Sequence, residues 1–364
     1  MPPRAMTSAK RTAAAAKPIR LLIVDDSAVA RAVFSRMVGE RPEFQIAATV
    51  ASAEAALAFL AVDRVDIIIL DIEMPGQDGL SAMPALIEAS RGARVLIVSS
   101  SAEQGAAASI RAMTLGAADT LAKPGIGSFN GRFAEILSER LVRIGHARET
   151  TAHRERMGKA PPPILLRTMN QSRVACVAIG ASTGGLHALS DLLRGLPASF
   201  APPILITQHL PPSFMTIFAA QIRDMSGRPT SVARPGMALA RGKILVAPGD
   251  GHLTIEVANG LPRVRITNER AESGCLPSVD PMLASAAEVF GTGAVGVVLS
   301  GMGRDGVRGA ERMAALGGDI FVQDRESSVV WGMPGTVAQA ALASAMLPPF
   351  QIADLLARRD KVAA

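Results

Sequence analysis

The chain has 364 residues, which is long for one ordinary domain and sufficient for two. Although 49% of the residues are hydrophobic, the longest apolar runs are strand-sized, far short of the roughly 20 residues that a membrane-spanning helix needs. Residues 1–19 contain no apolar block, so they do not resemble a secretory signal, and we expect a cytoplasmic protein. The two cysteines, Cys176 and Cys275, are far apart in sequence, which excludes a disulfide framework and disfavours a two-cysteine metal site.

The formal net charge of +6 is concentrated in two segments. Residues 1–19 contain four basic and no acidic residues, and residues 143–172 contain six basic and two acidic ones, so the rest of the chain carries a net charge of −2. Aromatic residues make up only 3% of the chain, which leaves few side chains for stacking on nucleic-acid bases. We therefore expect no nucleic-acid partner.

Composition also divides the chain. The segment before residue 173 combines charged and small residues with three consecutive prolines, Pro161 to Pro163, which is typical of a linker. The predicted division is a disordered basic tail over 1–19, a first domain over 20–138, a flexible linker over 139–172 and a second domain over 173–360.

The first domain alternates strand-length apolar runs with helix-period segments. The runs are LLIVDDS (21–27), FQIAATV (44–50), VDIIILDIEMPG (65–76), RVLIVSS (94–100) and DTLAKP (119–124). Helices are expected near Ser52, after Asp78 and through Phe133 to Leu141. Five strand–helix units predict a doubly wound α/β domain whose parallel sheet is covered on both faces.

Polar residues stand where these strands end. They are Asp25 and Asp26 after the first strand, Asp71 after the third, Ser99 after the fourth and Lys123 after the fifth. Ligands of such sheets bind at the carboxyl ends of the strands, so these side chains are expected to converge. Converging carboxylates favour a hard cation, and Mg²⁺ takes oxygen ligands while leaving room for a phosphoryl oxygen. A carboxylate held there is suited to nucleophilic attack on phosphorus.

With these residues, segment 20–138 resembles the receiver domain of bacterial two-component response regulators. The resemblance implies that Asp71 is the phosphoacceptor and that Asp25 and Asp26 form the Mg²⁺ pocket, to which Glu73 adds its main-chain carbonyl. It also implies a phosphate-sensing pair, Ser99 and Lys123. Thr120-Leu121 departs from the pattern, because many receivers carry an aromatic switch residue there.

The second domain repeats the strand-end arrangement with different chemistry. VACVAIG (174–180) precedes Ser182, PILITQ (203–208) precedes His209, and GAVGVVLSGMG (293–303) precedes Asp305. A serine, a histidine and an aspartate at neighbouring strand ends predict a nucleophile, its general base and the acid that orients the base. The helix after Ser182 directs free N–H groups towards an oxyanion, and the main chain at Met302 offers another donor.

These residues also have other interpretations. The pattern Gly180-x-Ser182-x-Gly184 alone is a weak nucleophile-elbow signal, and neither a complete GxGxxG nor a Walker A motif is present. Asp250 and Asp280 compete for the acid role, but Asp250 lies in a Pro-Gly-Asp-Gly turn and Asp280-Pro281 is typical of a helix start. The remaining histidines, His146, His153, His187 and His252, do not follow a hydrophobic strand.

The order Ser, His, Asp differs from the Ser, Asp/Glu, His order of α/β-hydrolases and disfavours an ordinary lipase or esterase. It is similar to the chemotaxis protein-glutamate methylesterase (CheB) family. The segments that carry this resemblance are IGASTGGLHAL, ITQHLPPSF, LVAPGDGHL, PSVDPML, VVLSGMGRDG and QDRESSVVWGMPG. Together with the receiver they span nearly the whole chain. Cys275-Leu276 stands where bulkier residues are common in the family, at the expected rim of the substrate groove.

The resemblance implies a Rossmann-like α/β catalytic domain in which Ser182 is the nucleophile, His209 the base and Asp305 its orienting acid. Thr183 and the Met302 amide are the implied supporting and oxyanion-hole groups. The implied reaction releases methanol from glutamate γ-methyl esters of chemotaxis receptors, and deamidates specific receptor glutamines, without a cofactor. The receiver is implied to inhibit this site until the chemotaxis histidine kinase phosphorylates Asp71.

Three alternatives stay open. A non-catalytic adaptor would retain function after Ser182→Ala, and an esterase with the same site would act on another protein. A transcriptional regulator would bind DNA through its basic linker, but the glycine-rich, strand-first second half does not resemble a winged helix or helix-turn-helix. A monomer is the default oligomeric state. The sequence does not identify the receptors, their glutamates or the cognate kinase.

Overall fold

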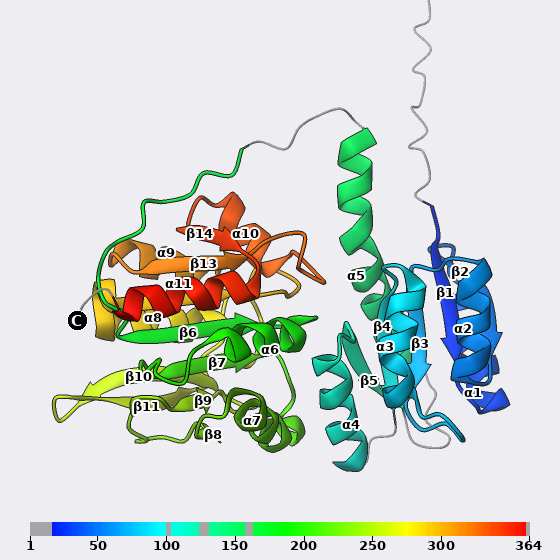
Figure 1. The fold of residues 1–364 in the computed structure, drawn as a ribbon, viewed down its shortest axis with the longest axis horizontal. Helices are drawn as coiled ribbons and strands as arrows, with labels where there is room; N and C mark the ends of the chain where they lie inside the picture. The colour runs from blue at the N-terminus through cyan, green and yellow to red at the C-terminus, as the bar shows by residue number, and fades with distance from the viewer. Residues whose placement is uncertain (1–16, 100–102, 124–130, 157–162, 362–364) are drawn as a thin grey trace, which may run out of the picture.

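The structure is a computed structural model that describes residues 17–99, 103–123, 131–156 and 163–361. The predicted tail therefore lies almost entirely outside the described residues. None of the helices in these ranges is long and apolar enough to cross a membrane. Figure 1 shows two α/β bodies side by side, each built around its own sheet.

The first sheet contains five parallel strands in the order β2-β1-β3-β4-β5. Its strands are β1 (Ile19–Val24), β2 (Phe44–Val50), β3 (Ile67–Asp71), β4 (Arg94–Ser99) and β5 (Asp119–Ala122). Its helices are α1 (Ala28–Gly39), α2 (Ala53–Val62), α3 (Gly79–Ser90), α4 (Glu103–Thr114) and α5 (Gly131–Arg156). The helix starts at Ser52 and Asp78 are confirmed, since each side chain accepts a hydrogen bond from a first-turn amide.

The second sheet contains seven parallel strands in the order β14-β13-β12-β6-β7-β9-β8. Its strands are β6 (Cys176–Ala181), β7 (Ile204–Gln208), β8 (Thr230–Val232), β9 (Ile244–Val246), β12 (Ala294–Val298), β13 (Asp319–Gln323) and β14 (Ala345–Leu347). An antiparallel hairpin, β10 (His252–Ala258) and β11 (Leu261–Thr267), stands beside it. The helices are α6 (Gly185–Gly195), α7 (Pro212–Ser226), α8 (Val279–Phe290), α9 (Val307–Ala315), α10 (Met333–Gln339) and α11 (Pro349–Lys361).

The predicted fold class of two parallel α/β sheets is confirmed. Every residue of the central strands β6, β7 and β12 is buried, as expected when helices cover both faces of a parallel sheet. Buried strands of this kind have continuous apolar sequences rather than alternating ones, so the sequence alone predicts them.

The segment predicted as a linker is structured over much of its length. Helix α5 continues to Arg156, and Leu141 and Ile144 extend the buried stripe that begins with Phe133 into the predicted linker. On the other side of residues 157–162, Arg167 donates from its amide to Ala343 and from its guanidinium to the carbonyls of Ala314 and Gly318. The end of the predicted linker therefore lies against the second domain.

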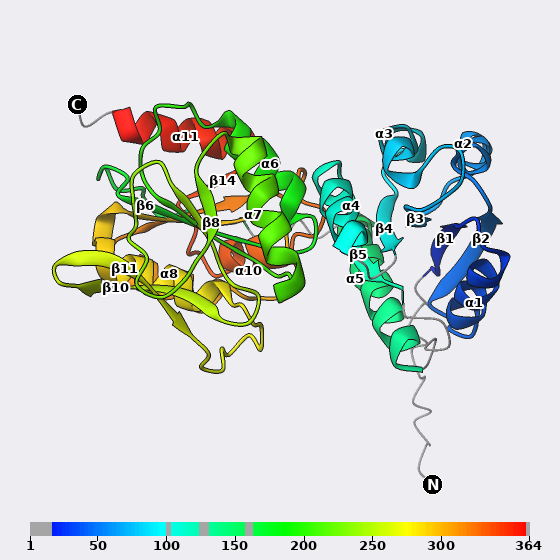
Figure 2. The same ribbon diagram turned by 90° about the horizontal axis from the view of Figure 1, so that it is seen from below.

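The two bodies touch through α4, which packs against α6 and α7 (Figure 2). The carbonyl of Ala118 accepts the amide of Gly184 at 2.8 Å, and the ring Nδ1 of His187 donates to the carbonyl of Thr114 at 3.2 Å. One continuous cluster of buried apolar side chains includes residues from both bodies. The contact from the first body therefore reaches Gly184, only two positions beyond Ser182.

Candidate functional site

Ser182 is the first residue after β6, at the start of the turn into α6. Its amide donates to the carbonyl of Ser300 at 3.0 Å, and its own carbonyl accepts the amide of Gly185 at 2.8 Å and Nε2 of Gln208 at 3.0 Å. These bonds tie the turn to the ends of the neighbouring strands on either side. The predicted nucleophile is thus held at the carboxyl edge of the sheet.

Glycines around Ser182 are required by close packing. Gly184 has a φ of 73°, and a Cβ there would lie 2.3 Å from Cβ of Val329. A Cβ on Gly301 would lie 2.8 Å from Cβ of Ser182 and 2.4 Å from Sδ of Met333. The strand-to-helix turn and the Gly301 segment can therefore approach each other only without side chains.

His209 follows β7 directly and lies beside Ser182. Its amide donates to the carbonyl of Ala181 at 3.2 Å, and its ring Nε2 donates to Oδ2 of Asp305 at 2.7 Å. The carboxylate of Asp305 is 1% exposed, whereas 17% of the His209 side chain is exposed. The predicted histidine and aspartate are therefore in direct contact, with the imidazole on the solvent side.

Three donors hold the carboxylate of Asp305. Besides His209, the hydroxyl of Ser278 donates to Oδ1 at 2.6 Å and the amide of Val279 donates to Oδ2 at 2.8 Å. Burial opposes ionisation, but these hydrogen bonds outweigh it and hold the pKa of Asp305 well below its ordinary value. Burial likewise opposes protonation of the imidazole, yet Asp305 and the nearby Cys275 raise the pKa of His209 to about 9.

Hydrogen-bond donors for an oxyanion lie around Ser182. Among the described residues, no protein group accepts a hydrogen bond from the amides of Thr183 and Met302. Thr183 precedes the first turn of α6, and Met302 follows Gly301, which is packed against Ser182. Within the same described residues the Ser182 hydroxyl makes no hydrogen bond to His209, as is common before substrate binds.

In the part of the chain that the structure describes, the other histidines and the competing aspartate Asp280 do not contact His209 or Asp305 in the manner of a base or its orienting acid. His252 is buried and bonds the amide of Ser278 and the carbonyl of Glu269, and His187 contacts Thr114 of the first body. Asp280 accepts the amide of Gly309 at 2.8 Å, and burial raises the pKa of its carboxyl to about 7. The side chains of His146 and His153 lie outside the described residues.

The sequence placed Cys275 at the rim of the substrate groove, but it did not predict its approach to His209 and Asp305 or the contacts of Ser278 and His252 at this site. Ser278 is also the N-cap of α8, so the expected helix start at Asp280-Pro281 is wrong by two residues. The segment Pro277 to Asp280 indicated a helix start, but nothing in it predicted a contact with Asp305.

A second cluster lies at the carboxyl edge of the first sheet. Asp25, Asp26 and Asp71 offer carboxylate oxygens within 4.8 Å of one another. Nζ of Lys123 lies 2.6 Å from Oδ2 of Asp71 and 2.9 Å from Oδ2 of Asp25. Burial raises the pKa of Asp71 despite this ammonium, while hydrogen bonds to both aspartates outweigh burial and raise the pKa of Lys123.

The residues of this cluster fit Mg²⁺. All three donors are carboxylates, and the buried Oδ2 of Asp25 has no hydrogen-bond partner with good geometry among the described residues, despite its ion pair with Lys123. The amide of Glu73 donates to Oδ1 of Asp71 at 3.3 Å, which places Glu73 beside the cluster. Ser99 ends β4, but its side chain lies outside the described residues; Thr120 and Leu121 both lie in β5.

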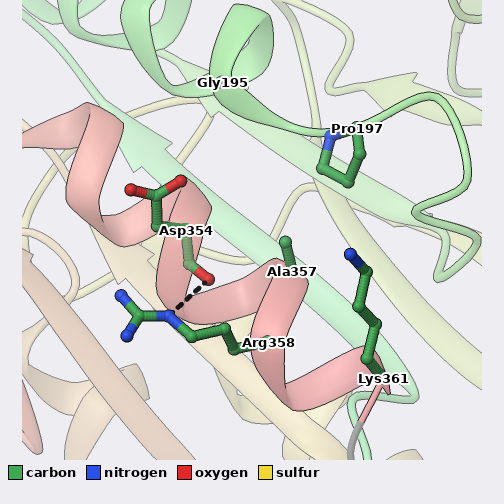
Figure 3. A pocket seen from close by; sticks show the side chains of 6 residues that line it. All are labelled: Gly195, Pro197, Asp354, Ala357, Arg358 and Lys361. Atoms are coloured by element: carbon green, nitrogen blue, oxygen red, sulfur yellow. Dashed lines mark hydrogen bonds between the residues drawn. The ribbon is translucent and has the colours of Figure 1, made fainter.

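Another hollow lies at the far end of α6, between its last turn and α11 (Figure 3). Its lining residues are Gly195, Pro197, Asp354, Ala357, Arg358 and Lys361. Because α6 has 11 residues, about 16 Å of helix separate this hollow from the Ser182 end. It lies at the opposite edge of the sheet from the candidate triad.

Two parallel α/β domains, one with an acid pocket and a lysine and one with serine, histidine and aspartate at its strand ends, define a hydrolase that carries a receiver domain. Comparison with known proteins identifies the family. The family model "CheB methylesterase" matches residues 177–356, and the model "Response regulator receiver domain" matches residues 21–127.

Full-length relatives are similar over nearly the whole chain. The protein-glutamate methylesterase/protein-glutamine glutaminase of group 2 operon from Rhodospirillum centenum is 38% identical, with 95% of this chain and 94% of the relative covered. Protein-glutamate methylesterase/protein-glutamine glutaminase 2 from Caulobacter vibrioides is 40% identical, with 94% and 99% covered. The crystal structure of the Thermotoga maritima CheB methylesterase catalytic domain is 33% identical, with a TM-score of 0.49, and covers 51% of this chain and 98% of that one. This chain belongs to the CheB methylesterase family, which confirms the predicted resemblance.

Proposed function

We propose that this protein hydrolyses γ-methyl esters of glutamate residues on chemotaxis receptors and releases methanol, under the control of its receiver domain. The observation that carries this proposal is the hydrogen-bonded pair of His209 and Asp305 beside Ser182, in a chain of the CheB family. Relatives that share the whole chain length are named for this activity and for protein-glutamine glutaminase. We extend both activities to this chain, because an amide and an ester of the same side chain present the same carbonyl.

The proposed mechanism begins at the hydroxyl of Ser182. Its oxygen attacks the ester carbonyl while His209 accepts the hydroxyl proton, and Asp305 stabilises the resulting imidazolium. In this proposal the amides of Thr183 and Met302 would donate to the tetrahedral oxyanion. The imidazolium then protonates the leaving methoxide, so that methanol departs and an acyl-enzyme remains.

Hydrolysis of the acyl-enzyme completes the cycle. His209 now takes a proton from water, and the hydroxide formed attacks the acyl carbonyl. Collapse of the second tetrahedral intermediate returns the proton to Ser182 and leaves a free glutamate carboxylate. With a glutamine substrate, the same sequence releases ammonia instead of methanol.

Control is assigned to the receiver body. Asp71 is the proposed phosphoacceptor for a chemotaxis histidine kinase, and Asp25, Asp26 and the Glu73 carbonyl would hold Mg²⁺, which neutralises charge on the transferred phosphoryl group. Lys123, with Ser99, would bind the new phosphate. The contact of Ala118 with Gly184 lies next to Ser182, so a shift of α4 and β5 on phosphorylation would change the surroundings of the nucleophile.

The direct test is methanol release from the methylated cytoplasmic domain of a chemotaxis receptor. Wild-type protein is expected to release methanol, and Ser182→Ala is expected to abolish release while leaving thermal unfolding unchanged. Retained receptor modification by Ser182→Ala would support an adaptor instead. Ester hydrolysis on model substrates without release from receptors would indicate a different protein substrate.

A further inference from the structure

Cys275 borders the proposed triad but has no part in the proposed mechanism. It lies between β11 and α8, is partly buried, and donates from its amide to the hydroxyl of Ser273 at 3.3 Å. Three possible metal ligands meet here, one atom from each of Cys275, His209 and Asp305. These three atoms all lie within 4.8 Å of one another. The only other such group of three in the described part of the chain is the acidic cluster of the receiver.

We propose that Cys275, His209 and Asp305 form a binding site for Zn²⁺, or a similar borderline divalent transition metal, and that metal bound there inhibits the esterase. Thiolate, imidazole and carboxylate are the three ligand types that Zn²⁺ accepts in proteins. Three protein ligands leave one tetrahedral position for water, and the two negative charges balance the cation. The inhibitory consequence rests on the proposed function, but the metal site itself does not.

The geometry needs only small adjustments to bind the metal. With zinc bonds of about 2.0–2.3 Å, ligand atoms on one tetrahedral ion are about 3.3–3.6 Å apart. The three ligand atoms here lie within 4.8 Å of one another, so side-chain movements of about 1 Å would bring them to that spacing. A carboxylate offers about four lone-pair positions, and three donors occupy positions on Asp305, which leaves one for the ion. Cys275 is on an irregular segment that can move towards His209.

The donor set also specifies which metal is taken. The receiver cluster of Asp25, Asp26 and Asp71 consists of oxygen donors, which suit Mg²⁺. The thiolate and imidazole at the esterase site are softer ligands and favour zinc over magnesium. The two clusters are therefore expected to bind different cations in one molecule.

Inhibition follows from the lone pair of His209. A metal on the ring nitrogen takes the electron pair that would accept the proton of Ser182, so the nucleophile loses its base. Binding releases the thiol proton of Cys275, and an imidazole nitrogen that carries a proton releases it when it binds the metal. The site would thus make hydrolysis sensitive to free zinc.

Binding is tested by cobalt spectroscopy on the full-length reduced protein stripped of metal. Added Co²⁺ is expected to give a near-ultraviolet sulfur-to-cobalt charge-transfer band that Zn²⁺ abolishes and excess Mg²⁺ does not. Cys275→Ser keeps the size of the side chain but lacks the soft ligand, so the band is expected to vanish. Cys176 serves as the internal control, because it is fully buried and present in both proteins. No band in wild type, or a band that persists in Cys275→Ser, would overturn the site.

Inhibition is tested on methanol release in buffers of fixed free Zn²⁺. Each protein is compared with its own metal-free rate, and Cys275→Ser is expected to need at least about tenfold more Zn²⁺ for half inhibition. Equal zinc sensitivity of the two proteins would overturn the inhibitory role even if the cobalt band is present. If neither protein releases methanol without metal, the proposed function fails, while the cobalt band still decides whether the metal site exists.

Discussion

At the residue scale, the orientation of Asp305 depends on three donors from two separate places in the chain, His209 and the adjacent residues Ser278 and Val279. His209, Ser278 and the Val279 amide reach its two oxygens at 2.6–2.8 Å, and the nearest of these donors in sequence is 26 residues away. Charge-assisted hydrogen bonds of this length are among the stronger ones in proteins. Ser278 is therefore a positioning residue for the acid of the proposed triad.

Ser278→Ala is expected to lower kcat/KM by roughly 10- to 150-fold, the equivalent of one hydrogen bond to a charged group. The substitution leaves Oδ1 of Asp305 without its 2.6 Å donor, so the carboxylate becomes more basic and the pKa of His209 rises further. The measurement is the pH profile of kcat/KM, which should move to higher pH. Loss of the α8 N-cap should also cost about 1 kcal/mol of stability.

Ser285→Ala is the matched control for that prediction. Ser285 is also a buried serine of α8, and it bonds the amide of Ile255 and the carbonyl of Met282 instead of a triad residue. It should lose stability without moving the pH profile. Equal profile shifts in the two variants would assign Ser278 a purely structural role.

The base gives a second prediction. Since Asp305 raises the pKa of His209 to about 9 and only the neutral imidazole accepts a proton, basal kcat/KM should rise with pH and level off near pH 9. Asp305→Asn removes the raising charge, so its profile should level off at lower pH and at a rate lower by about 10⁴-fold. Profiles measured with EDTA between about pH 6 and pH 10 test this. A wild-type plateau already near the ordinary histidine pKa would contradict it.

Candidate residues could be predicted from sequence where the fold itself brings them together. Ser182, His209 and Asp305 each follow a buried apolar strand, and parallel strands present their carboxyl ends at one edge. Ser278 and Cys275 precede a helix instead of following a strand, so their contacts depend on the path of a loop. The path of that loop is determined by packing between distant segments of the chain. The periodicity of hydrophobic residues in the sequence does not predict such packing.

At the element scale, the turn from β6 into α6 and the segment after β12 approach each other without side chains between them. Gly301→Ala would place a Cβ 2.8 Å from Cβ of Ser182 and 2.4 Å from Sδ of Met333. We expect a loss of about 1–3 kcal/mol of stability from overpacking, together with a displaced nucleophile and a fall in kcat. Thermal unfolding and single-turnover hydrolysis measure the two effects.

Gly39→Ala is the matched control for this change. Gly39 ends α1, and a Cβ there would meet only Cδ1 of Ile46, at 4.0 Å. This substitution should be neutral or stabilise the protein by about 0.4–1 kcal/mol. If Gly301→Ala behaves in the same way, the close approach does not constrain the site.

Element types were predicted better than element ends. The strands and the helix starts at Ser52 and Asp78 agree with the structure, because capping side chains act on their own first turn. Helix α8 begins at Val279, before the proline that suggested its start, because Ser278 caps it and Asp280 turns inward to the amide of Gly309. Helix α5 extends to Arg156, into a segment whose charged residues indicated a linker.

At the scale of the whole molecule, a buried ion pair joins the C-terminal helix to the sheet and to the segment that follows residues 157–162. Arg359 lies 2.8 Å from Oδ2 of Asp319 and also donates to Oδ1 of Asn170 and the carbonyl of Ser172. Arg359→Ala leaves the carboxylate of Asp319 buried without its cation. It should destabilise the catalytic body by roughly 3–5 kcal/mol, measured by denaturant unfolding.

Arg173→Ala is the control for that ion pair. Arg173 pairs with Asp360 at 3.2 Å, but about half of the Arg173 side chain is exposed (49%), so its loss should change stability by less than about 1 kcal/mol. Similar losses in the two variants would mean that burial does not distinguish these pairs. The unfolding transition of the receiver body should stay in place in both variants.

The final prediction concerns communication between the two bodies. The acid cluster of Asp71 and the esterase site lie at the strand ends of different sheets. The contact of Ala118 with Gly184 connects the residue before β5 of one sheet to the turn after β6 of the other. With Mg²⁺ and a small phosphodonor, methanol release should rise by about 5- to 150-fold, the usual range of coupling between two sites. Asp71→Asn should abolish this rise.

Asp78→Asn is the control for this activation. Asp78 caps α3 through a 2.6 Å hydrogen bond from the amide of Ser81, and asparagine caps a helix equally well, so activation should persist. Activation of Asp71→Asn to the wild-type level would place the phosphate elsewhere. Phosphorylation of wild type without any change in methanol release would show that Thr120-Leu121, in place of an aromatic switch residue, leaves the phosphorylated cluster uncoupled from the contact at Gly184.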